Sequence, residues 1–186
     1  KILEIAKKNN IHIIEDSAQG MGSYYKNKHA GTFGEISAFS AHPLKNLNAV
    51  GDAGFITTDN EDLYNSIKLF RSHGMESRDN VKFFGINSRL DSLNAEILSY
   101  RLTRLKEVVA KRRKNISLYK KYIKSDKVKL PQDGEHTFDS YVMMISECEE
   151  RDELQSYLKS KNIQSLVYYG TPLHLHKASK ILGYKE

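Results

Sequence analysis

Hydrophobic residues recur at helical spacing near the start of the chain and again over its middle. Residues 2–8 and 61–73 each place apolar side chains on one helical face. Residues 90–124 form the longest stretch of this kind. Asp59 or Asn60 can cap the helix that begins at residue 61. We therefore predict three helical regions in the first two thirds of the chain.

Short runs rich in β-branched and aromatic residues lie between and after these helices and predict strands. The runs occupy residues 11–14, 36–40, 55–58, 141–145 and 164–168. A helix predicted over 149–161 separates the last two strands, which indicates a small βαβ-like lobe. The turn at residues 129–134 contains Pro and Gly and marks a change of pattern before that lobe. The mixture of helices and strands predicts an α/β fold.

The composition limits the classes of protein. The chain has 186 residues, 39% of them hydrophobic, which is enough for one domain or for one domain and part of another. No apolar run approaches the roughly 18 residues that cross a bilayer, so we expect no membrane partner. The single cysteine, Cys148, cannot form an internal disulfide, which fits the predicted cytoplasmic location. The net charge of +6 favours anionic partners such as phosphates or nucleotides.

Two carboxylates, Glu15 and Asp16, follow the first predicted strand. The carboxyl ends of strands are where open α/β sheets bind ligands. Asp16 could cap the next turn, bind a metal or pair with a bound cation. A metal needs three or four converging ligands. Apart from His174 and His176 on an expected loop, no histidine has a His or Cys partner at ligand spacing, so we predict no metal site.

Lys45 lies in a polar turn directly after the strand predicted at 36–40. A solvated surface lysine is the ordinary interpretation, but its neighbours favour another. Partial burial removes solvation from an ammonium group and lets a lysine act as an imine-forming amine. Ser40, five residues earlier, could donate to a phosphate, and Asp16 could hold a protonated ring nitrogen. Pyridoxal phosphate requires those three functions.

Several blocks of sequence resemble, in order and with similar spacing, the DegT-type family of sugar aminotransferases. The blocks are residues 15–19 (EDSAQ), 31–36 (GTFGEI), 39–47 (FSAHPLKNL), 51–54 (GDAG), 71–74 (RSHG), 85–91 (GINSRLD) and 169–176 (YGTPLHLH). The resemblance covers nearly the whole chain and is to the C-terminal half of the family's sequence. Because the chain begins at Lys1 inside a helical pattern, we expect it to be a fragment of a longer protein.

The resemblance implies a fold and a division into domains. The fold is the α/β fold of fold-type I enzymes that use pyridoxal phosphate, with a mixed sheet and flanking helices. Residues 1–115 would form the second half of the large cofactor-binding domain together with a long connecting helix. Residues 116–186 would form an incomplete small C-terminal α/β domain.

The resemblance also implies roles for individual residues. Lys45 matches the lysine that forms an imine with pyridoxal phosphate, and Asp16 matches the aspartate paired with the ring nitrogen. Gln19 matches a glutamine near the ring hydroxyl, and Ser40 matches the phosphate-binding serine. Asn87 matches an asparagine that reaches the phosphate from the other subunit, so we expect a homodimer.

Other positions are less specific. His174 falls in a block near the sugar site, although a loop histidine of the small lobe is an equal interpretation. Asn48 stands where the family usually has Gly, and we expect it to tolerate a left-handed backbone there. Val50 replaces a common aromatic residue, and Glu96 replaces a common Ala. None of these departures removes a catalytic function.

The implied activity is the transfer of an amino group from glutamate to the keto group of a nucleotide-linked sugar. Residues 87–91 (NSRLD) and 172–174 (PLH) are most similar to the branch that aminates carbon 3 of dTDP-linked 3-keto-6-deoxy sugars, which serves polysaccharide or lipopolysaccharide synthesis. One alternative is a sugar dehydratase of the same fold, but such relatives carry His where this chain has Lys45. Another is a fragment without function. A nucleic-acid-binding protein using the basic residues 101–127 is a third, but no recognised motif accompanies them, so we expect no nucleic-acid partner.

Overall fold

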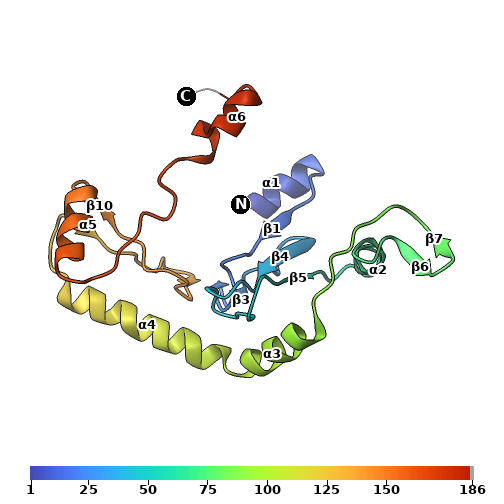
Figure 1. Ribbon diagram of the computed structural model, residues 1–186, viewed down its shortest axis with the longest axis horizontal. Helices are drawn as coiled ribbons and strands as arrows, with labels where there is room; N and C mark the ends of the chain where they lie inside the picture. Colours follow the sequence, from blue (N-terminus) through green and yellow to red (C-terminus); the bar gives the residue numbers. More distant parts are fainter. Residues whose placement is uncertain (185–186) are drawn as a thin grey trace. The chain divides into compact units, whose positions relative to one another are not determined.

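A computed structural model describes residues 1–184, and they divide into two compact units (Figure 1). Unit 1 comprises residues 1–124 and 130–145, and unit 2 comprises residues 125–129 and the chain from Ser146 onward. The predicted boundary after residue 115 falls inside the continuous helix α4 (Leu105–Tyr122). The division of the whole protein into domains stays a prediction.

The principal sheet of unit 1 has three strands in the order β1-β4-β5 (Figure 1). Helix α1 (Ile2–Asn9) precedes β1 (Ile14–Asp16), which runs parallel to β4 (Ile36–Ser40). Strand β5 (Gly54–Thr57) runs antiparallel to β4. The strand predicted at 36–40 is confirmed. The strand predicted at 11–14 is shifted, because β1 begins at Ile14, which pairs with Ile36, the first residue of β4. The mixed sheet with helices confirms the predicted α/β fold.

The two faces of this sheet differ in burial. Successive residues of a strand point to opposite faces. Ser37 and Phe39 are buried on one face, where the Phe39 ring stacks on Phe55 with centroids 5.0 Å apart. Gly31 lies against that ring with φ of +83°, and an added Cβ would come 2.2 Å from Phe39, so only glycine fits there. Ala38 and the other residues of the opposite face are largely exposed in the described chain.

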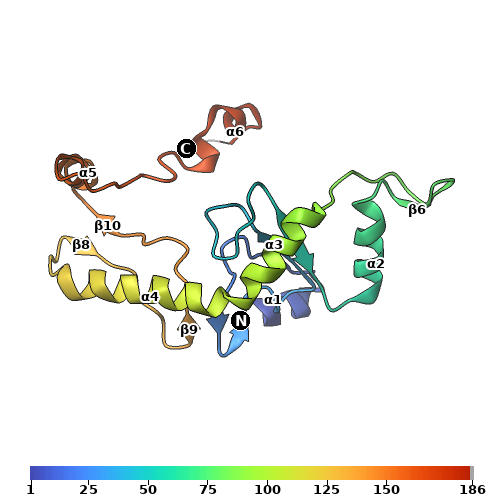
Figure 2. The same cartoon turned by 60° about the horizontal axis from the view of Figure 1, so that its bottom comes forward.

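Helices α2 (Glu61–Phe70), α3 (Ser92–Thr103) and α4 follow the sheet. Of the two predicted caps of α2, Asn60 is the one that acts, because its Oδ1 accepts from the Leu63 amide at 3.0 Å. The predicted helix over 90–124 is two helices, which meet at Arg104 and run in different directions (Figure 2). Leu98 of α3 packs into the core with residues that follow β4.

Two short hairpins were not predicted. Strands β2 (Tyr24–Tyr25) and β3 (Lys28–His29) are joined by Lys26 and Asn27, which have φ values of 47° and 62°. This two-residue turn has positive φ at both positions but lacks the glycine that usually signals such turns. Strand β9 (Thr137–Phe138) pairs with β2. The second hairpin joins β6 (Met75–Ser77) to β7 (Asn80–Val81).

Unit 2 contains β8 (Val128–Lys129) paired with β10 (Glu147–Cys148), and then α5 (Arg151–Ser160), a 3₁₀ turn η1 (Leu173–Leu175) and α6 (Lys177–Ile181). Helix α5 confirms the helix predicted at 149–161. The strand predicted at 164–168 is wrong, because those residues pair with no strand in the part of the chain that the structure describes.

The strand predicted at 141–145 is also wrong. Tyr141 has φ of +51°, which is outside the strand region. Arg112 of α4 donates to the carbonyl oxygens of Tyr141 and Val142, at 3.4 and 2.8 Å. These carbonyls bind a helix side chain in place of a neighbouring strand.

No helix within residues 1–184 is long and apolar enough to cross a membrane. Over the same residues, no group of three or more His, Cys, Asp or Glu side chains is arranged to hold a metal ion.

Candidate active site

The parallel pairing of β1 and β4 brings two predicted site residues to one edge of the sheet. Asp16 is the last residue of β1 and Ser40 is the last residue of β4. Asp16 pairs with Ala38, so Ser40 lies two residues further along the same face. Both residues therefore lie on the more exposed face of the sheet, at the carboxyl end of their strands.

The Asp16 carboxylate is only partly used within the fold. Its Oδ1 accepts from the Ala18 amide at 3.1 Å and so caps the turn that follows β1. The start of that turn is tied to β4, because the amide of the buried Ser17 donates to the Ala38 carbonyl at 2.9 Å. The other carboxylate oxygen makes no hydrogen bond or ion pair among residues 1–184. Asp16 can therefore cap this turn and still accept from a bound cationic group.

The adjacent carboxylate, Glu15, has a different role that we did not predict from the sequence. It lies on the opposite face of the sheet and accepts from the backbone amides of Gly31, Phe33 and Gly34, at 2.8, 2.5 and 2.6 Å. Glu15 thus fixes the loop that covers the sheet. The two-residue alternation of a strand was the available signal, since it places neighbouring side chains on opposite faces.

Lys45 lies in the turn that leaves β4. Its amide donates to the His42 carbonyl at 2.8 Å, and the His42 amide donates to Ser40 Oγ at 3.3 Å. Hydrogen bonds from two backbone amides, through His42, thus link the serine at the end of β4 to the lysine. The Lys45 side chain is half-buried, and its ammonium makes no hydrogen bond or ion pair with any described residue. Its amine is available to a ligand.

The residue after Lys45 anchors the turn in the interior of unit 1. Asn46 is buried, and its Nδ2 donates to the Met21 and Ser140 carbonyls at 3.3 and 3.4 Å. Its Oδ1 is buried without a hydrogen-bond partner among the described residues. Leu47 packs with Leu98 in the core cluster. We did not predict from the sequence that Asn46 anchors the turn, and its position beside Lys45 is the only signal that points to it.

The other predicted site residues lie in separate places. Gln19 is exposed in the turn after Asp16. Asn87 lies in the loop before α3, where its Oδ1 accepts from Arg89 Nε at 3.1 Å. Within residues 1–184, Asn87 makes no hydrogen bond to Asp16, Ser40 or Lys45. His174 belongs to η1 of unit 2 and is exposed.

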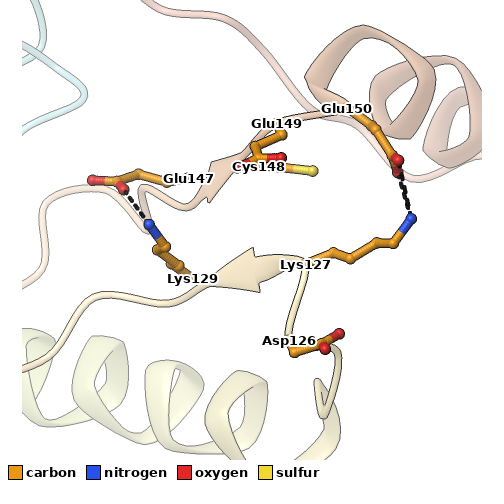
Figure 3. Close-up of a pocket in the computed structure, with 7 residues that line it drawn as sticks. All are labelled: Asp126, Lys127, Lys129, Glu147, Cys148, Glu149 and Glu150. Atoms are coloured by element: carbon orange, nitrogen blue, oxygen red, sulfur yellow. Dashed lines mark hydrogen bonds and ion pairs between the residues drawn. The ribbon is translucent and has the colours of Figure 1, made fainter.

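None of the predicted site residues lines either of two hollows in the structure. The hollow in unit 2 has a volume of about 380 Å³ and lies over β8 and β10 (Figure 3). Its lysines are already paired, Lys127 with Glu150 at 3.0 Å and Lys129 with Glu147 at 3.8 Å. The second hollow, of about 570 Å³, lies beside α2 and β6. The candidate site is the open edge of the sheet.

The groups at this edge fit one kind of ligand. They are a carboxylate with one oxygen and a primary amine that have no partner in the described part of the chain, and a hydroxyl at the start of a turn, supplied by Asp16, Lys45 and Ser40. A carboxylate suits a protonated ring nitrogen, an amine can condense with an aldehyde, and a hydroxyl can donate to a phosphate. The donor set therefore fits pyridoxal phosphate.

Comparisons with known proteins show which family the chain matches. Residues 1–186 match the DegT/DnrJ/EryC1/StrS aminotransferase family. The chain is 39% identical over 177 residues to the dTDP-3-amino-3,6-dideoxy-alpha-D-galactopyranose transaminase of Aneurinibacillus thermoaerophilus, covering 94% of this chain and 48% of that protein. It is 38% identical over 191 residues to the pleiotropic regulatory protein of Geobacillus stearothermophilus, covering 100% of this chain and 50% of that protein.

A solved structure has the same fold. The crystal structure of a DegT DnrJ EryC1 StrS aminotransferase from Brucella abortus matches with a TM-score of 0.91 at 33% identity. The match covers 96% of this chain and 48% of that one. The chain thus spans about half the length of the curated relatives and the solved structure that it matches.

Proposed function

The chain belongs to the DegT/DnrJ/EryC1/StrS aminotransferase family, and on that premise we propose that the full-length protein is a pyridoxal-phosphate-dependent aminotransferase of nucleotide-linked keto sugars. Family membership confirms the resemblance found in the sequence. The observation that carries the proposal is the amine of Lys45, which has no partner among residues 1–184. Lys45 lies in the turn after Ser40, and Ser40 ends the strand that pairs with the strand of Asp16.

Each residue of the sheet edge has a task in this proposal. Pyridoxal phosphate, when bound, supplies an aldehyde that exchanges nitrogen with amino compounds and a ring that accepts electrons. Asp16 would hold the proton on the ring nitrogen, Ser40 would donate to the phosphate, and Gln19 would lie near the ring hydroxyl. Lys45 would hold the cofactor at rest. Once released, its Nζ would take a proton from the α-carbon of the amino donor and later return one.

The proposed substrates follow from the relatives. The Aneurinibacillus relative is named as a transaminase of a dTDP-linked 3-amino-3,6-dideoxy sugar. We therefore propose a dTDP-linked 3-keto-6-deoxy sugar as the acceptor and glutamate as the donor, in the synthesis of a surface polysaccharide. The net charge of +6 suits an anionic nucleotide diphosphate. His174 would contact the sugar.

The contacts of α4 argue against a nucleic-acid-binding function. Arg112 donates to two backbone carbonyls, and Arg113 pairs with Asp133 at 2.6 Å. Lys111 pairs with Glu107 at 2.6 Å. Several basic residues of this helix thus serve the fold, which leaves fewer free cations for a phosphate backbone. Lys45 likewise favours an aminotransferase over a dehydratase of the same fold.

The test uses the full-length protein that contains these residues. We expect added pyridoxal phosphate to give an absorbance band at the violet edge of the visible range, and glutamate to shift that band to shorter wavelength. Lys45→Ala should remove the band. A band that glutamate cannot change would contradict the aminotransferase and favour the dehydratase, and a protein that binds no cofactor would contradict both.

A second test addresses the proposed homodimer. If the partner subunit's Asn87 completes each site, a Lys45→Ala subunit and an Asn87→Ala subunit should together form one intact site per mixed dimer. Mixing the two inactive proteins under conditions of subunit exchange should then restore activity to a fraction of wild type. Confirmed exchange without any recovery would contradict the shared site.

A further inference from the structure

We propose that Asn48 and Arg101 form a clamp that positions Lys45 for its reaction with the cofactor. The inference rests on the proposed function and adds two positioning residues to it. Neither residue belongs to the predicted site. The clamp closes the chain segment from Pro43 to Ala49, which contains the half-buried Lys45.

Asn48 supplies the inner half of the clamp. Its Nδ2 donates to the Pro43 carbonyl at 2.9 Å, which joins the two ends of the turn on either side of Lys45. Its Oδ1 accepts from Arg101 Nη1 at 3.1 Å. One side chain thus links the lysine turn to helix α3.

The backbone of Asn48 shows why this residue stands where relatives usually have glycine. Asn48 is not among the described residues with positive φ, so the left-handed backbone that asparagine would tolerate is not adopted here. Conformational freedom is therefore not what the position requires in this chain. The two side-chain hydrogen bonds, which glycine cannot make, give the asparagine its function.

Arg101 supplies the outer half. From α3 its Nη1 donates to the Asn48 carbonyl at 2.5 Å, to Asn48 Oδ1 at 3.1 Å and to the Ala49 carbonyl at 3.3 Å. Charge-assisted hydrogen bonds from a guanidinium are stronger than neutral ones. Leu98, one helical turn earlier, belongs to the same core cluster as Ala49. Helix α3 therefore holds the segment by packing and by hydrogen bonds together.

Asn46 and Leu47 anchor the turn on the C-terminal side of Lys45, whereas Lys45 itself has few restraints besides the clamp. The Lys45 amide has one backbone hydrogen bond, to His42, and the ammonium has no partner among the described residues. A reacting amine that moves by about 1 Å from its productive position can lose roughly 10²-fold in rate. Loss of the clamp should therefore slow reaction at Lys45 without removing the amine.

The test compares Asn48→Ala, Arg101→Met and Arg101→Lys with wild type in the full-length protein. Arg112→Met is the matched control, because Arg112 is also half-buried and also donates to backbone carbonyls, but at Tyr141 and Val142. The first measurement is amide hydrogen exchange of residues 44–49 in the cofactor-free protein. The second is the rate at which added pyridoxal phosphate forms its imine band.

We expect Arg101→Met and Asn48→Ala to speed exchange at residues 44–49 at least about tenfold and to slow imine formation by a similar factor. Arg101→Lys should recover part of both effects. The double variant should lose less than the sum of the singles, because the two residues share a hydrogen bond. Arg112→Met should leave both readouts unchanged even where it lowers the melting temperature.

Unchanged exchange at residues 44–49 in both Arg101→Met and Asn48→Ala would overturn the clamp. So would an equal slowing of imine formation in Arg112→Met, since the effect would then be general destabilisation. If wild type forms no imine band, the proposed function fails instead, and the exchange measurement still decides whether the clamp holds the turn.

Discussion

Unit 1 contains two groups of charged and polar side chains, which differ in whether their members are paired with one another. In the first group, Arg113 of α4 donates to Asp133 Oδ2 and to the Asp139 carbonyl, both at 2.6 Å. Tyr141 donates to Asp133 Oδ1 at 3.1 Å. At the sheet edge, Asp16 keeps one carboxylate oxygen free and Lys45 has no side-chain partner among the described residues. Partnered groups stabilise the fold, whereas unpartnered groups are available to a ligand.

The bonding of the first group also changes its ionisation. The hydrogen bond from Arg113 holds the pKa of the Asp133 carboxyl below its ordinary value and raises the pKa of the guanidinium. Burial, followed by the hydrogen bond to Asp133, raises the pKa of Tyr141. Arg113 also lies over the Phe138 ring, 4.1 Å from its centroid. This cluster is a structural ion pair that joins α4 to the segment after Asp133.

The largest expected effect comes from removing the unpartnered amine. Lys45→Ala should lower transamination at least about 10³-fold, because the side chain is both the imine-forming amine and the group that moves the proton. The melting temperature of the cofactor-free protein should stay unchanged, since no hydrogen bond of the side chain is lost. Steady-state kinetics and thermal unfolding measure the two quantities. Lys68→Ala is the control, and a comparable loss of activity there would contradict the assignment.

The next prediction separates two neighbours in the sequence. Asp16→Asn should lower kcat about 10²-fold, because the negative charge that holds the ring proton is lost. The amide oxygen can still cap the turn, so the free energy of unfolding should change by less than about 0.5 kcal/mol.

Glu15→Gln should show the opposite pattern. It weakens three charge-assisted hydrogen bonds from backbone amides, and we expect a loss of about 1–2 kcal/mol in the free energy of unfolding. Denaturant titration and kcat, measured on both variants, test the pair. If Asp16→Asn destabilises as much as Glu15→Gln, the contrast between the two faces of the sheet is wrong.

The third prediction concerns the partnered cluster. Arg113→Met removes the ion pair and leaves Asp133 half-buried without its cation, which should cost about 2 kcal/mol in the free energy of unfolding. Adding Asp133→Asn should recover part of that cost, because the unpaired charge is then gone. Denaturant titrations of the single and double variants measure both. If kcat falls further than the loss of folded protein explains, the cluster would belong to the active site, against our interpretation.

The smallest expected effect is a pH dependence. Because the pKa of Asp133 is lower in the folded state than in the unfolded chain, its contribution to stability is complete above the unfolded value of about 4 and is lost as pH falls through the folded value. The stability difference between wild type and Asp133→Asn should therefore shrink from pH 6 towards pH 3. A difference that stays constant over this range would mean that the ion pair does not lower the pKa.

The sequence by itself determined those features that depend on nearby residues. Helices α1, α2 and α5 were predicted because their hydrogen bonds join residues four apart and their apolar faces are visible as a local period. Strand β4 was found because its short apolar run lies between turn residues. The positions of Asp16, Ser40 and Lys45 relative to the predicted strands made them candidates, and the order and spacing of the family blocks identified the family.

Only the tertiary structure decided the features that join distant residues. A strand exists through its partner, so the run at 164–168 forms none, whereas β2 pairs with β9 more than 100 residues later. The pairing of β1 with β4 put Asp16 and Ser40 on one face and directed Glu15 to the other. The hydrogen bonds from Arg101 to Asn48 cross 53 residues, and no local pattern marks them. Contacts of this kind depend on how elements pack, which a local period does not encode.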